Sequence, residues 1–107
     1  MTQLDHASRS SEPKFWLGQF SVTEQASQVL DLEDVLICLK RHHTGDWGDL
    51  CAEDIAANEY ALQNGGRLFS AYHDPKGVKF WIITEADRKH TNVELNICVV
   101  MLSLQKC

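Results

Sequence analysis

The stretch from His42 to Leu50, which reads HHTGDWGDL, gathers several residue types that can do chemistry into one short segment, here called the 42–50 cluster. With the cysteine that follows, it supplies five possible ligands of zinc or another divalent ion: His42, His43, Asp46, Asp49 and Cys51. Their spacing matches no strong zinc signature, and neighbouring histidines on a helix point to different sides. We therefore expect neither a bound metal nor a cofactor. If a metal does bind, the candidate ligands are His42, His43, Asp46 and Asp49.

A second segment, WIITEADR at residues 81–88, places two carboxylates and a guanidinium at the end of an apolar run and is called the 81–88 cluster. Glu85 or Asp87 could assist His43 in acid–base catalysis, as a carboxylate beside a proton shuttle. Nothing in the sequence shows that these groups converge. The candidate nucleophiles, a cysteine in an expected helix and a serine in an expected strand, lack the elbow or oxyanion motif that would activate them.

Turn chemistry favours a structural role for the 42–50 cluster. Asp46 and Asp49 can accept amide hydrogens in a tight turn and at the start of the next helix, while Trp47 fills the core. One of the two histidines would then pair with a carboxylate or extend its ring toward the surface. The cluster is thus interpreted first as a way of holding the chain in shape.

Charges at the end of a strand usually fix neighbouring elements to each other, and Arg67 or Arg88 could pair in this way with nearby carboxylates. Binding of a partner is the next interpretation, and it remains open for both clusters. The candidate partner-binding residues are Asp46, Trp47, Asp49, Asp54, Trp81, Glu85, Asp87 and Arg88.

The composition is that of one globular domain of 107 residues, with 44% hydrophobic and 23% charged residues. A net charge of -5 argues against direct binding to a nucleic-acid backbone, which requires clustered Lys and Arg. The acidity serves solubility or complements a basic partner, such as a nucleic-acid-binding protein.

The four cysteines are widely spaced, contain no CxxC pair and follow no secretory signal. This pattern predicts reduced thiols and a cytoplasmic location. No apolar run reaches the roughly 18 residues that a membrane-spanning helix needs, so we expect no membrane association.

The elements that must position these residues begin after a flexible tail, residues 1–14, and form a single domain over residues 15–107. Ser21 and Glu24 fit a capping box for a short helix that ends near Leu30. Asp31 can cap a second helix, which Gly45 would terminate. Its predicted buried face is Leu32, Val35, Leu36 and Leu39. A third helix is expected over residues 52–64.

From Arg67 the hydrophobic period changes from that of a helix to that of a strand. Strands over residues 67–73 and 78–84 form a β-hairpin around an Asp-Pro-Lys-Gly turn, and a third strand runs from residue 92 to about residue 102. The predicted fold is α+β, with three N-terminal helices packed on one face of a three-stranded antiparallel sheet. The apolar third strand, if its edge is exposed, would favour a homodimer.

The blocks RHHTGDWGDL, CAEDIAANEYAL, GGRLFSAY and WIITEADR, in this order and at this spacing, resemble a family of small plasmid-related proteins found on bacterial plasmids and integrated mobile elements. The resemblance covers residues 15–91, and the chain departs from the family pattern after Arg88. It implies a genetic setting and no specific chemistry. Small acidic proteins of mobile elements often counter host defence as anti-restriction or anti-CRISPR factors.

Three functional hypotheses follow from these observations. The first is a non-catalytic protein-binding module of a mobile element, which inhibits a host defence system by docking on a defence protein, for example a nucleic-acid-binding complex. The second is a small metal-dependent or acid–base enzyme that uses the 42–50 cluster. The third is an accessory protein of plasmid maintenance.

Overall fold

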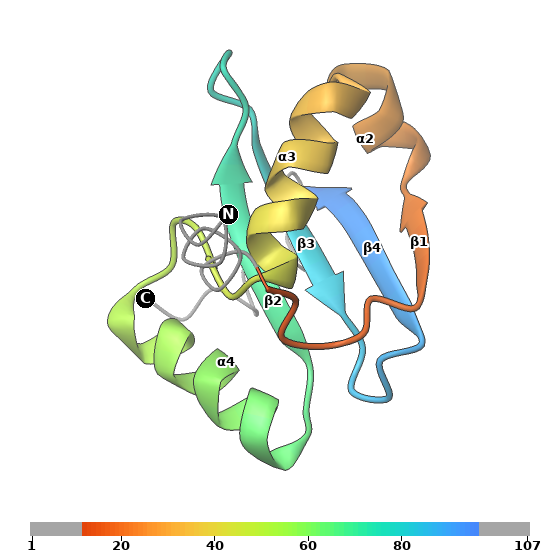
Figure 1. Ribbon diagram of the computed structural model, residues 1–107. Helices are drawn as coiled ribbons and strands as arrows, with labels where there is room; N and C mark the ends of the chain where they lie inside the picture. Colours follow the sequence, from red (N-terminus) through yellow and green to blue (C-terminus); the bar gives the residue numbers. More distant parts are fainter. Residues whose placement is uncertain (1–11, 97–107) are drawn as a thin grey trace, which may run out of the picture.

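A computed structural model describes residues 12–96 as one mixed sheet flanked by three helices (Figure 1). The end of the predicted third strand and most of the predicted tail lie outside the described residues. The elements follow the order β1 Gln19–Val22, α2 Glu24–Val29, α3 Leu32–His43, α4 Ala52–Asn64, β2 Leu68–His73, β3 Lys79–Thr84 and β4 His90–Leu95.

The sheet has four strands in the order β1-β4-β3-β2. The pairs β2–β3 and β3–β4 are antiparallel, whereas β1 pairs parallel to β4 with Gln19 opposite His90. The α+β class is therefore confirmed, but the three-stranded, all-antiparallel sheet is wrong. A strand also precedes the helices, because residues 19–22, which include the expected helix cap Ser21, form β1. Parallel pairing needs a long connection, and the helices with the hairpin provide it.

The start of α2 differs from the predicted capping box. Ser21 lies in β1, where its hydroxyl donates to Asn92 Oδ1 at 2.8 Å. Thr23 is the N-cap instead, and its Oγ1 accepts the amide hydrogen of Ala26 at 3.2 Å. A hydroxyl at either position would suit a cap, so the pairing of β1 with β4 decides which residue takes the role.

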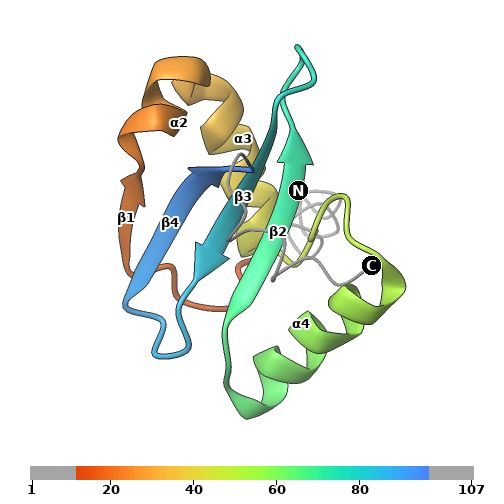
Figure 2. The same cartoon turned by 180° about the vertical axis from the view of Figure 1, so that it is seen from behind.

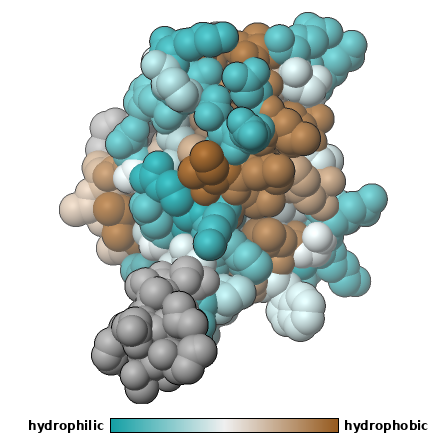
Figure 3. Space-filling view, turned by 45° about the horizontal axis from the view of Figure 1, so that its top comes forward, coloured by the Kyte–Doolittle hydropathy of each residue, from teal (hydrophilic) through white to brown (hydrophobic). Residues whose placement is uncertain are grey.

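Helices α2 and α3 cover one face of the sheet, as the two opposite views show (Figures 1 and 2). The core between them consists of Ala26, Leu30, Val35, Cys38, Tyr72, Phe80, Ile82, Val93 and Leu95. Helix α3 turns Val35, Cys38 and His42 inward, whereas Leu32 and Leu36 are 62% and 46% exposed. The predicted buried face is thus wrong for both leucines, and this side of the molecule shows hydrophobic side chains at its surface (Figure 3).

Helix α4 lies beside β2, apart from α2 and α3, so the prediction that all helices pack on one sheet face is wrong (Figure 2). Asn58 explains its position, because its side-chain amide donates to the Phe69 carbonyl at 2.7 Å and accepts from the Phe69 amide at 3.1 Å. The side chain thereby satisfies the backbone of an edge strand, as another strand would. Trp47, Ala61 and Leu68 form the small core beneath the helix.

Candidate functional site

The 42–50 cluster pairs with the outer edge of β2. The amide of Asp49 donates to the Ala71 carbonyl at 2.7 Å, and the Ala71 amide donates to the Trp47 carbonyl at 3.1 Å. Between them, Gly48 has a φ of 75°, and a Cβ at this position would collide with the Ala71 carbonyl oxygen. Glycine is therefore required here both for the backbone conformation and for the close approach. The segment protects the sheet edge together with Asn58.

Asp46 fixes this segment to the end of α3. Its carboxylate accepts from Arg41 Nε at 2.8 Å and Nη2 at 3.2 Å, and from the Gly48 amide at 3.2 Å. The bonds from Arg41 lower the pKa of the Asp46 carboxyl, because they favour its charged form. The Tyr72 hydroxyl donates to the Asp46 carbonyl at 2.6 Å. Asp46 thus has the predicted turn role.

The two remaining members of the turn have different surroundings. Trp47 is buried, and its indole Nε1 donates to Glu59 Oε2 at 2.8 Å, which ties the turn to α4. Asp49 Oδ2 lies 2.7 Å from His73 Nδ1 in an exposed pair. The prediction that Trp47 fills the core is confirmed.

His42 lies at the centre of a buried chain of hydrogen bonds. Its Nδ1 is 2.6 Å from Ser70 Oγ, and its Nε2 is 2.9 Å from Thr84 Oγ1. Thr84 Oγ1 is in turn 2.7 Å from Thr91 Oγ1, which donates to the Leu17 carbonyl at 2.7 Å. The chain therefore joins α3 to three strands and to the segment before β1.

The donor and acceptor in each of these bonds follow from the bond between Thr91 and the Leu17 carbonyl. A carbonyl only accepts, so Thr91 donates its single hydroxyl hydrogen to it and must accept from Thr84. Thr84 must then accept from His42, which places the hydrogen on Nε2 and leaves Nδ1 to accept from Ser70. The geometry thus selects the neutral Nε2–H tautomer of His42.

Burial lowers the pKa of His42 to about 3, with smaller contributions from His43 and Arg88. At neutral pH the imidazole is uncharged and enclosed by hydrogen-bonding partners within the protein. A general acid or base needs a pKa near the operating pH and access to a substrate. His42 is therefore suited to structure and not to proton transfer.

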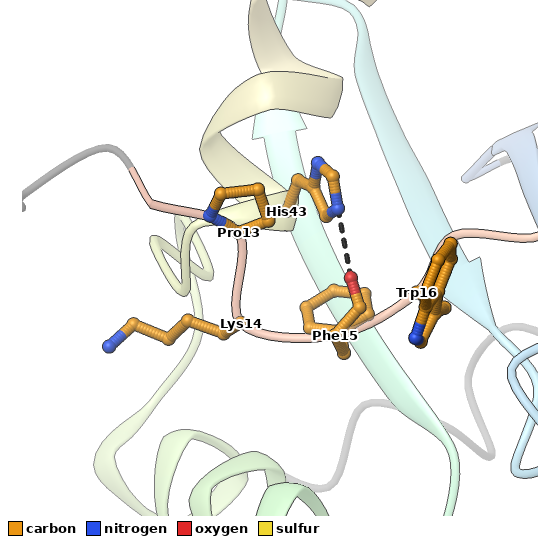
Figure 4. Close-up of a pocket in the computed structure, with 5 residues that line it drawn as sticks. All are labelled: Pro13, Lys14, Phe15, Trp16 and His43. Atoms are coloured by element: carbon orange, nitrogen blue, oxygen red, sulfur yellow. Dashed lines mark hydrogen bonds between the residues drawn. The ribbon is translucent and has the colours of Figure 1, made fainter. Parts of the chain in front are cut away.

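His43 points away from this network, as expected for adjacent histidines. Its Nε2 lies 2.9 Å from the Phe15 carbonyl, to which it donates (Figure 4). The ring borders a shallow depression of about 490 Å³ that is lined by Pro13, Lys14, Phe15, Trp16 and His43. The contact holds the segment before β1 against the end of α3.

The 81–88 cluster is a connection between the β3–β4 turn and α4. Arg88, which has a φ of 62°, donates from Nη1 to the Gly66 carbonyl at 2.6 Å and from Nη2 to the Ala61 carbonyl at 3.2 Å. Cations stabilise the carbonyl-rich end of a helix. Glu85 lies 3.5 Å from Arg67 Nε in an exposed ion pair. The predicted structural lock is present, with carbonyls in place of carboxylates as the partners of Arg88.

The two clusters touch inside the fold, where His42 contacts Thr84, but their acidic side chains do not meet. Asp49 contacts His73 at the end of β2, whereas Glu85 contacts Arg67, the residue just before β2 begins. His73 and Arg67 are six positions apart. Six steps of a strand span about 20 Å. Within residues 12–96 no three histidine, cysteine or acidic side chains are grouped so that they could hold a metal ion.

The candidate partner-binding residues divide by exposure. Trp47, Asp54 and Trp81 are buried, so they form no part of the surface in this conformation. Asp46, Asp49, Glu85 and Asp87 are exposed, and Arg88 is half-buried. Cys51 is disulfide-bonded, so the expectation that all four cysteines are reduced thiols is wrong.

One exposed apolar surface, on α3, was not predicted from the sequence. Leu32, Leu36 and Ile37 are exposed on this helix, beside a depression of about 400 Å³. Ile37 could have indicated this surface, because it lies outside the predicted buried face and directly follows Leu36. Two adjacent apolar residues on a helix cannot both point into one narrow core stripe.

Comparison with known proteins gives no match to a family model, to a curated protein or to a solved structure. The resemblance to plasmid-related proteins therefore stays a prediction. Between residues 12 and 96 no helix is both long enough and apolar enough to cross a membrane.

Proposed function

We propose that the protein is a non-catalytic protein-binding module of a mobile element that docks on a basic, nucleic-acid-binding host defence protein and inhibits it. The first support is the use of the chemistry-bearing residues inside the fold. His42 bridges strands, Asp46 holds a turn, and Arg88 donates to one carbonyl of α4 and one just beyond its end. These contacts favour a binding role over the enzymatic hypothesis.

The observation that carries the proposal is the outer face of α4. No Lys or Arg occurs between Arg41 and Arg67, a stretch that includes the whole helix. Glu53 is exposed on α4 and Tyr60, seven residues further on, is 68% exposed; Glu59 is also exposed, although one of its oxygens accepts from Trp47. An acidic surface around an exposed aromatic ring complements a cationic groove, because opposite charges speed the encounter and tyrosine provides contact area.

Defence inhibition can be tested by plasmid transformation of hosts that carry a CRISPR or a restriction system. Expression of the protein should raise the transformation efficiency against at least one system. Glu53→Lys combined with Tyr60→Ala should abolish the protection, because it removes the charge and the ring. Glu24→Lys reverses an exposed charge on α2 and serves as the matched control, which should retain protection.

Direct binding should follow the same pattern with the purified defence effector of the responsive system. The affinity should fall as salt rises, since exposed charges are screened beyond about 10 Å at 0.1 M salt. Protection that survives the α4 double variant, or no protection against any system, would contradict the proposal.

A further inference from the structure

We propose that the exposed face of α3 binds the same face of a second copy of this chain, with the two helices antiparallel about a two-fold axis. This interaction surface is separate from the acidic face of α4 and does not depend on the function proposed above. Its occupant is argued from the pattern of apolar and charged residues along α3.

The centre of the face is apolar. Leu32, Leu36 and Ile37 are all exposed, and the side of the molecule formed by α2 and α3 shows a group of hydrophobic side chains (Figure 3). Single exposed apolar residues are ordinary, but a contiguous group on one helix is typical of an interaction surface. The buried side of the helix already contacts the sheet through Val35 and Cys38. The exposed leucines and the isoleucine are therefore available to a partner.

The charges on the same face are self-complementary. Glu33 and Lys40 lie seven residues apart, so they project from the same side of the helix after nearly two turns. They are placed symmetrically about the midpoint between Leu36 and Ile37. In a two-fold antiparallel pair, Glu33 of each copy would face Lys40 of the other. Neither residue forms an ion pair within residues 12–96, so both charges remain available.

The shape of the surface fits the same arrangement. A depression of about 400 Å³ is lined by Leu36, Ile37, Lys40, Arg41 and Thr44. The symmetry that pairs Glu33 with Lys40 brings Leu32 of the second copy opposite Arg41, at this depression. An apolar side chain would thus enter a hollow bordered by Leu36 and Ile37 together with the side chains of three polar residues, as in helix packing by ridges and grooves.

A second copy fits this face better than an unrelated partner does, because the same twelve-residue helix provides both the acidic and the basic half. The contact extends for about 18 Å, the length of the helix. Such a short interface belongs to the small, transient class, so the dimer should be weak, with a dissociation constant in roughly the micromolar range.

Sedimentation velocity between roughly 1 and 300 µM tests the proposal, since this range brackets a weak interface. The wild-type chain should shift from monomer to dimer as concentration rises. Glu33→Lys and Lys40→Glu should each weaken the dimer by about tenfold, because each places two pairs of like charges together. The double variant Glu33→Lys, Lys40→Glu should recover near wild-type association, which a general loss of folding cannot produce.

Leu36→Asp should abolish the dimer, whereas Tyr60→Asp, a matched change at an exposed hydrophobic residue of α4, should leave it intact. A monomer at every concentration would overturn the proposal, as would a dimer insensitive to the α3 variants. Loss of defence-effector binding by Leu36→Asp without any wild-type dimer would assign the face to a host partner and overturn it as well. Failure of the α4 variants to alter host protection bears on the proposed function alone.

Discussion

Helices α3 and α4 have nearly the same length, twelve and thirteen residues, but different relations to the sheet. Helix α3 crosses a sheet face and anchors itself there with an apolar core and the buried His42. Helix α4 lies at the sheet edge, held by Asn58 and by the Arg88 bond to the Ala61 carbonyl in its last turn. The outer side of α3 is apolar with both signs of charge, whereas that of α4 is acidic.

This difference shows how one small domain can present two surfaces of different specificity. A helix on the sheet face is fixed by an extended core, which leaves the exposed apolar residues of its outer side for the proposed contact with a second copy. A helix at the edge is fixed by a few polar contacts, and the acidic outer side of α4 suits the proposed basic partner. The polar residues that first suggested chemistry connect the two helices to the sheet.

The largest effect is expected from His42→Ala, which removes the anchor of α3. The change leaves Ser70 and Thr84 without their partner and opens a cavity in the core. We expect the free energy of unfolding to fall by about 3 to 5 kcal/mol, measured by urea denaturation. His43→Ala, the adjacent control, should lose less than about 1 kcal/mol, because its bond to Phe15 is at the edge of the fold. Equal losses would break the distinction between the two histidines.

The second expected effect is a pH dependence of stability that arises from His42. Its pKa is about 3 in the folded chain and about 6.5 when unfolded, so the unfolded state binds more protons between these values. The contribution of His42 to stability should therefore be complete above pH 6.5 and decline as pH falls toward 3, by about 5 kcal/mol in total. Denaturation at several pH values measures this slope. His42→Gln cannot titrate, so its slope should be smaller, and an unchanged slope would exclude His42 as the source.

A smaller effect is expected at the edge, from Asn58→Ala. The change removes both bonds to the Phe69 backbone from a side chain that is buried. The loss should be about 1 to 3 kcal/mol. Hydrogen exchange should show faster opening of α4 and the Phe69 amide, while the strands β3 and β4 keep their protection. Uniform acceleration through the sheet would show that α4 is as integral to the core as α3.

The sequence predicted the elements whose signals are local. Helices α3 and α4 and the β2–β3 hairpin follow from periodicity, from Gly45 and from the Asp-Pro-Lys-Gly turn. The turn role of Asp46 was also predictable, because its partners lie within five residues. Such features depend on neighbouring residues alone.

Other features depend on residues that are far apart in the chain. Strand β1 has only four residues, and its pairing with β4 joins Gln19 to His90. His42 looked like a possible ligand because its partners, Ser70 and Thr84, are 28 and 42 positions away. Periodicity also cannot tell which side of α3 faces the sheet when a histidine occupies the core and Leu36 does not.

The most direct test of the structural role of the 42–50 cluster is an NMR titration of the His42 imidazole nitrogens. The nitrogen shifts should be those of a neutral ring with the hydrogen on Nε2, and they should stay unchanged from neutral pH until the fold is lost in acid. Titration of His42 near pH 6.5 would contradict the structural role, because it would show a ring that is free to take up a proton. A hydrogen on Nδ1 would contradict the bond directions, because Thr84 could not then accept from Nε2.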